Sequence, residues 1–107
     1  MGYSLVYVTA RDAEEAKQLG RGLVHAQLAA CVNVFPNMVP IFWWKGEVQE
    51  DAEAVLIAKT RDDLVDEVTS FVKDRHSYEC PAVVALPVRA GNAAFLDWID
   101  SETKAAE

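Results

Sequence analysis

The stretch from residue 29 to residue 61 constrains this chain most, because it is predicted to form two long strands joined by one tight turn. The first arm covers residues 30–44, with an interruption at 36–40 where two prolines cannot donate ladder hydrogen bonds. The return arm covers residues 48–60. At roughly 3.3 Å per residue each arm reaches roughly 40 Å, whereas a domain of this length has a radius of gyration of about 13 Å. One end of the ribbon should therefore extend beyond the chain's own core.

That projecting end carries the apolar run 41–44, which includes two tryptophans. An isolated hairpin is marginal in water, and an apolar tip promotes pairing with other chains. A second copy of the same chain is the simplest cover for such a surface. We therefore predict a homo-oligomer.

The remaining segments complete two βαβ halves. Alternation over 3–10 predicts the first strand, and an apolar run predicts the last strand over 82–88. Apolar residues at helical spacing predict helices over 12–28 and 61–75, and Asn92 begins a short C-terminal helix. The order β-α-β-β-α-β is that of an α+β ferredoxin-like sandwich, here with a long hairpin between the second and third strands. Two helices would cover one sheet face and leave the other largely bare, which is a second argument for assembly.

Local signals refine the two main helices. Asp12 and Thr60, each followed three residues later by an acidic residue, match a helix N-terminal capping pattern. Gly20 and Gly22 lie inside the first helix, where each costs about 1 kcal/mol relative to alanine. Small residues at these positions would instead let the helix approach the sheet closely.

Length and charge exclude several classes of protein. The 107 residues fit one domain, 1–107, with the polar segment 101–107 expected to fray. No apolar run is long enough to cross a membrane, and no signal peptide is recognisable at the N-terminus, so we expect a cytoplasmic location without membrane contact. The net charge of −7 argues against a nucleic-acid surface, which needs a basic patch.

The segment after the second helix holds the densest group of potential metal ligands. His76, Glu79 and Cys80 offer imidazole, carboxylate and thiolate, a set that suits copper or zinc. Adjacent strand residues point to opposite faces, so Glu79 and Cys80 would not share one metal ion. A further ligand would come from elsewhere in the chain or from another subunit. The alternative is a hydrogen-bonded loop histidine with Tyr78 packed as an aromatic plug.

Other candidate residues lie on the long ribbon. Cys31 packs in the core or acts as a soft metal ligand, the latter only if the fold brings it near His76. Trp43 and Trp44 point to opposite faces of a regular strand, so one could line a pocket and the other an interface. Lys59 ends a buried strand and is either an anion-binding group or a snorkelling lysine. The chain has no phosphate-binding loop, nucleophile elbow or HExxH motif, so no catalytic residue is predicted.

Several segments resemble one family, and they occur in the family's order over residues 3 to 100. They are Leu28–Asn33, Trp43–Glu47, Glu53–Thr60, His76–Pro81, Ala85–Val88, and Gly91–Asn92 with Phe95–Ile99. Together they closely resemble the CutA divalent-cation tolerance family. No single segment is specific, but the set is.

The resemblance implies a tight homotrimer like the nitrogen-regulatory PII proteins, binding of Cu(II) or another divalent metal ion, and a role in copper tolerance. No established enzymatic reaction comes with it. It implies Cys31 and His76 as metal ligands, with Glu79 as the nearest acidic candidate. The family usually reads His-Pro-Tyr-Glu-x-Pro-Glu, whereas here Ser77 replaces the first proline and Ala82 the final glutamate. The second change removes one potential ligand.

Two other interpretations remain at this point. The first is a PII-like signalling module that binds a small molecule or anion between subunits, with Lys59, Tyr78 and Trp44 in the pocket. The second is a phosphatase on the same scaffold, which ranks last because fold alone supports no activity and the chain lacks a phosphate cradle.

Overall fold

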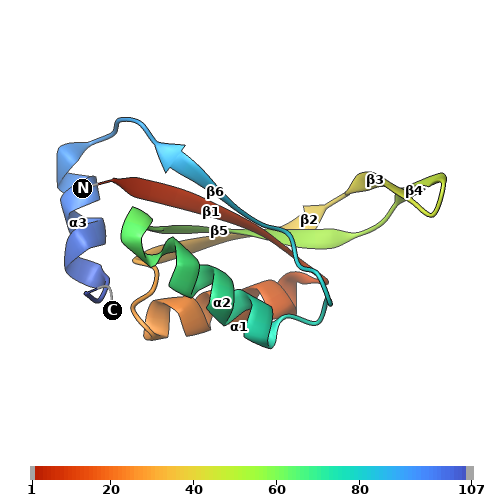
Figure 1. Cartoon of the computed structure of the whole chain (residues 1–107), viewed down its shortest axis with the longest axis horizontal. Helices are drawn as coiled ribbons and strands as arrows, with labels where there is room; N and C mark the ends of the chain where they lie inside the picture. The colour runs from red at the N-terminus through yellow and green to blue at the C-terminus, as the bar shows by residue number, and fades with distance from the viewer. Residues whose placement is uncertain (1, 106–107) are drawn as a thin grey trace.

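The computed structural model describes residues 2–105 and confirms the predicted ferredoxin-like sandwich (Figure 1). The strands are β1 (Tyr3–Ala10), β2 (Cys31–Met38), β3 (Ile41–Trp44), β4 (Glu47–Glu50), β5 (Glu53–Arg61) and β6 (Val83–Val88). The helices are α1 (Ala13–His25), α2 (Val65–Arg75), which follows the 3-10 turn η1 (Asp62–Leu64), and α3 (Ala93–Glu102). Four strands form one antiparallel sheet in the order β2-β5-β1-β6, and β3 pairs only with β4.

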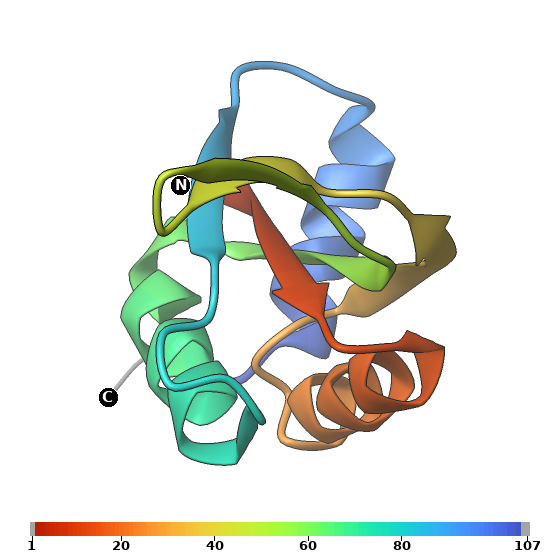
Figure 2. The same ribbon diagram turned by 90° about the vertical axis from the view of Figure 1, so that its right-hand side faces the viewer.

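The core lies between one face of this sheet and the two long helices. Figure 2, seen from the hairpin end, shows α1 and α2 side by side beneath the sheet. Alternate residues of β1 are buried, as the period of two predicts, and β5 is buried over most of its length because it lies between β2 and β1. The largest fully buried apolar side chains on this face are Leu23, Leu56, Leu64, Val6, Val8, Val68 and Val72. We call the opposite face of the sheet, which α1 and α2 leave uncovered, the open face.

Gly20 and Gly22 mark two close approaches of α1. The approach at Gly20 is to the sheet, as predicted, whereas the approach at Gly22 is to α2, which was not predicted. A Cβ atom built on Gly20 would lie 2.9 Å from Cγ1 of Val32 on β2. One built on Gly22 would lie 2.6 Å from Cζ of Phe71 on α2. The helix-weakening glycines are therefore required by packing.

We expect Gly20→Ala to lower the free energy of unfolding by about 1–3 kcal/mol, although alanine is the better helix former, because the added methyl overlaps Val32 in a packed core. Urea unfolding followed by tryptophan fluorescence measures this change. Gln18→Ala, at an exposed position of the same helix, is the matched control and should be neutral or slightly stabilising. Equal stability of the two variants would contradict the packing argument.

The long ribbon breaks and then projects, as predicted. The pairing of β2 with β5 shifts register between Phe35 and Met38, where Pro36 interrupts the ladder. The β3–β4 hairpin then turns through Lys45 and Gly46, with φ of 50° and 81°, as a two-residue hairpin turn with positive φ at both central positions requires. The molecule is 44 Å long but only 26 and 21 Å across, and the hairpin forms one end of it (Figure 1).

The C-terminal segment 101–107, expected to fray, is instead packed in its described part. Thr103 is buried and accepts a hydrogen bond from the Arg61 guanidinium at 2.9 Å. The backbone amide of Lys104 donates to the carbonyl oxygen of Gln27 at 2.9 Å. The polar composition gave no sign of this, because both partners are distant in sequence. The last two residues of the chain lie outside the described part.

The predicted helix starts had different outcomes. The carboxylate of Asp12 accepts from the backbone amide of Glu15 at 2.9 Å, which confirms the first cap. Thr60 does not cap, because its hydroxyl donates to the carbonyl oxygen of Leu28 at 2.6 Å. The second helical segment begins after Arg61 with no side-chain capping bond.

Candidate metal and ligand sites

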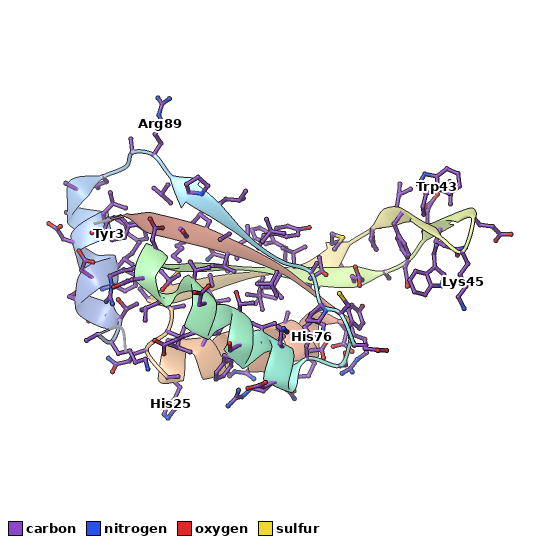
Figure 3. All side chains as sticks on the ribbon, in the orientation of Figure 1. Tyr3, His25, Trp43, Lys45, His76 and Arg89 are labelled. Atoms are coloured by element: carbon purple, nitrogen blue, oxygen red, sulfur yellow. The ribbon has the colours of Figure 1, made fainter. Side chains whose placement is uncertain are left out.

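His76 follows α2, and its imidazole is fully buried beneath the loop that leads to β6 (Figure 3). Its Nε2 donates to the carbonyl oxygen of Thr9 at 2.7 Å, and its Nδ1 accepts from the backbone amide of Tyr78 at 3.0 Å. In this arrangement Nδ1 is the acceptor and the ring proton lies on Nε2. Both nitrogens are therefore engaged, and binding a metal would require the ring to give up at least one of these bonds.

Glu15 of α1 supports the same loop from inside the molecule. Its carboxylate is buried and accepts from the backbone amides of Arg11 at 2.8 Å and Ser77 at 2.9 Å. It lies 4.0 Å from Nδ1 of His76. Burial alone would raise the pKa of Glu15, but the hydrogen bonds from Arg11 and Ser77 outweigh it and hold the pKa below its usual value. Sequence reasoning treated Glu15 only as part of a helix start, although its place on the apolar side of α1 was a signal of burial.

Tyr78 closes the pocket over His76 and links it to the hairpin. The two rings lie with their centroids 4.7 Å apart. The Tyr78 hydroxyl donates to the carboxylate of Glu53 at the start of β5. Burial, together with this bond to Glu53, raises the pKa of Tyr78 above its usual value. These contacts are those of the alternative interpretation, a hydrogen-bonded loop histidine under an aromatic plug.

Cys31 lies far from His76 within one chain. It begins β2 directly opposite Lys59, whose Nζ donates to Sγ of Cys31 at 3.5 Å. His76 instead contacts Thr9, which pairs with Val55, four residues from Lys59 along β5. That separation is roughly 13 Å along the strand. One chain therefore does not bring Cys31 and His76 together.

The remaining candidate ligands are dispersed as well. Glu79 and Cys80 are both exposed on the loop before β6. Within residues 2–105, no group of three or more histidine, cysteine, aspartate or glutamate side chains is placed to hold a metal ion. A metal site built from Cys31, His76 and Glu79 would have to combine ligands from different copies of the chain.

The three residues of the predicted ligand pocket lie along the length of the molecule. Lys59 lies near α3, with Nζ 5.6 Å from the ring centroid of Phe95. Tyr78 bonds to Glu53 at the start of β5, where the hairpin ends. Trp44 ends β3 next to the turn, with its ring 5.8 Å from Nζ of Lys45, which Figure 3 shows at the tip of the hairpin. A pocket that contains all three would also need more than one subunit.

Exposed apolar side chains concentrate on the hairpin and on the open face of the sheet. They are Phe35, Ile41, Phe42, Trp43, Trp44, Val48, Val84 and Leu86. On the hairpin, Trp43 faces Val48 across the strands while the neighbouring Trp44 faces Glu47, so the two tryptophans lie on opposite faces. An apolar surface of this kind marks an interaction site.

Comparison with protein families gives one assignment. The family model described as "CutA1 divalent ion tolerance protein" matches residues 4–102. "Protein CutA 1, chloroplastic" of Oryza sativa subsp. japonica is 44% identical over 100 residues, which are 94% of this chain and 56% of that protein. "Divalent-cation tolerance protein CutA" of Archaeoglobus fulgidus is 42% identical over 98 residues, 92% of this chain and 95% of that protein. The chain thus spans about half the length of the plant and mammalian relatives that it matches.

Solved structures agree with this assignment. The crystal structure of CutA1 from Oryza sativa superposes with a TM-score of 0.96 at 42% identity, covering 99% of this chain and 97% of that one. The structure of the "Periplasmic divalent cation tolerance protein CutA" from Archaeoglobus fulgidus gives 0.92 at 39% identity, with 95% and 99% covered.

No helix within residues 2–105 is long and apolar enough to cross a membrane. On sequence and structure alike, the chain belongs to the CutA1 divalent ion tolerance protein family.

Proposed function

We propose that this chain works as a homotrimeric divalent-cation tolerance protein that binds Cu(II) or another divalent metal ion and contributes to the response to metal ions. The observation that carries the metal part of the proposal is the match to the divalent ion tolerance family over residues 4–102. The net charge of −7 supports it, since an acidic surface attracts cations. A non-catalytic role in the cytoplasm, without nucleic-acid or membrane partners, is part of the same proposal.

The trimer is supported by the apolar surfaces that one chain leaves uncovered. Trp43 at the hairpin tip is 73% exposed, and Val84 and Leu86 on the open face are about half exposed. Closed rings of identical subunits cover such surfaces without creating open filaments. Three copies are what the family resemblance implies.

The proposed metal ligands are Cys31 from one subunit and His76 with Glu79 from another. Thiolate, imidazole and carboxylate fit Cu(II) or Zn(II) by donor type. Their positions fit only in part, because Cys31 and His76 lie roughly 13 Å apart along the sheet of one chain. Nδ1 is the unprotonated nitrogen of His76, so it would be the ligand atom once the amide of Tyr78 moves away from it.

Titration calorimetry of the assembled protein tests the role of Cys31. We expect Cys31→Ser to weaken binding of Cu(II), and of redox-inert Zn(II) titrated in parallel, by at least about tenfold, because a thiolate ligand is lost. Cys80→Ser is the matched control, since it removes the chain's other thiol, which is exposed. If Cys31→Ser and the unchanged protein bind both metals equally, Cys31 is not a ligand.

An alternative function is a PII-like signalling module that binds a small molecule or anion in the cleft between subunits. The observation that favours this alternative is that the ammonium group of Lys59 forms no ion pair with a carboxylate within residues 2–105. Lys59→Gln would then abolish binding of an anionic ligand. A structure of the assembly with an ordered organic anion at Lys59, and no metal nearby, would favour this alternative.

A further inference from the structure

Cys31 and Lys59 form a directly opposed cross-strand pair at the edge of the sheet. The residues that flank Lys59 in β5, Ala58 and Thr60, are fully buried on the helix side, so Lys59 points to the open face. Cross-strand partners keep their Cβ atoms about 4.5–5.5 Å apart. The sheet register therefore holds the amine beside the sulfur, with Nζ 3.5 Å from Sγ.

Ion pairing does not account for the position of the Lys59 side chain. No carboxylate forms an ion pair with it anywhere in the described chain. Its partner on β1 is Leu5, and the ring of Phe95 lies near its ammonium group. The sulfur of Cys31 accepts the hydrogen bond that the Lys59 side chain donates. A thiol and an amine held in contact on a largely apolar surface are arranged for a reaction between them.

We propose that Cys31 and Lys59 are an oxidant-sensitive modification site, at which hydrogen peroxide converts the thiol and the amine into a covalent sulfenamide. In the first step the sulfur attacks one peroxide oxygen as the thiolate and the O–O bond breaks, and the leaving hydroxide takes up the proton that the thiol has released. The products are the sulfenic acid of Cys31 and one water, so the sulfur is oxidised and the peroxide is reduced.

In the second step the Lys59 amine, after its ammonium group has released a proton to water, attacks the sulfenic sulfur. The S–N bond forms and the S–O bond breaks. Hydroxide leaves and takes a remaining amine proton, so a second water is released. The protein loses two hydrogen atoms overall, one peroxide is consumed and two waters form. Sulfenic acids condense with backbone nitrogen in the same way.

The other cysteine of the chain provides an internal comparison. Cys80 is exposed, whereas Cys31 is only partly accessible. Within residues 2–105 no lysine contacts the sulfur of Cys80. Its oxidation should therefore give only sulfenic, sulfinic or sulfonic acid, or a disulfide. The new bond at Cys31 would tie β2 to β5 and remove a thiol and a positive charge together. The proposal does not depend on metal binding, although the bond would remove Cys31 as a metal ligand.

The test uses the full-length, metal-free Cys80→Ser protein, treated with a small excess of hydrogen peroxide and analysed by intact and tryptic mass spectrometry. We expect the loss of two hydrogen atoms, a link between the peptides that contain Cys31 and Lys59, and full reversal by a thiol reductant. Reaction of the remaining thiol with iodoacetamide should be lost in parallel.

Two further variants in the Cys80→Ser background make the result decisive. Cys31→Ser should show neither the loss of two hydrogen atoms nor a link, and Lys59→Arg, which keeps the charge but removes the amine, should gain oxygen at Cys31 without a link. The proposal is overturned if Cys31 gains only oxygen while Lys59 is present, if a disulfide between two chains forms instead, or if Lys59→Arg shows the same loss of hydrogen. Because no metal is present, these outcomes are separate from those of the calorimetric test.

Discussion

If the chain forms the proposed trimer, a variant in which Ile41 and Trp43 are both replaced by serine is expected to be monomeric at micromolar concentrations at which the unchanged chain is assembled. Both side chains lie on the same face of the hairpin, beside Val48, and both are more than half exposed in the single chain. Burying each contributes about 1.5–3 kcal/mol. Losing both costs about 4 kcal/mol per subunit, which weakens association by roughly a thousandfold for each of the three subunits.

Light scattering after size-exclusion chromatography measures this change, since the trimer has three times the 11.8 kDa mass of one chain. Gln49→Ser is the matched control, because it alters a polar side chain on the opposite face of the same hairpin. Circular dichroism should show that the double variant keeps its sheet and helices, since neither side chain belongs to the core. A double variant that stays trimeric would exclude this hairpin face as the main interface.

Replacement of His76 by alanine is expected to lower the free energy of unfolding of the metal-free protein by about 3–5 kcal/mol. The change deletes a fully buried ring and leaves the carbonyl of Thr9 and the amide of Tyr78 without partners. That loss is a large fraction of the total stability of a small domain. Chemical denaturation in the presence of a chelator measures it.

The chain's other histidine is the control for this experiment. His25 is exposed at the end of α1 (Figure 3), so His25→Ala should change stability by less than about 0.5 kcal/mol. A residue that serves only as a metal ligand would affect stability when metal is bound and leave the metal-free protein unchanged. If metal-free His76→Ala is as stable as His25→Ala, the buried hydrogen bonds around His76 are not important for folding.

The element order, the break at the prolines and the projecting hairpin were predictable from the sequence, because each depends on local pattern. Alternation marks β1, and the apolar run of β5 marks a central strand. The close approach of Gly20 to Val32 was also predictable, since a glycine inside a helix usually has a packing reason.

The surroundings of the candidate ligands were not predictable, because they depend on partners far away in the chain. His76 bonds to Thr9, which is 67 positions earlier, and Ser77 bonds to Glu15, which is 62 positions earlier. The spacing of residues around His76 left both a metal ligand and a hydrogen-bonded loop histidine open, and the resemblance implied the ligand. The tertiary contacts, which engage both of its nitrogens, were visible in neither. The pairing of Cys31 with Lys59 depends on the register between β2 and β5, which no local signal specifies.

The hairpin has a thermodynamic consequence. Its apolar side chains find no cover in their own subunit, so in the proposed trimer the free energy of assembly adds to the stability of the folded chain by mass action. Dilution then acts as a mild denaturant, and the apparent melting temperature rises with protein concentration. A free energy of unfolding measured at one protein concentration would therefore depend on that concentration as well as on the sequence.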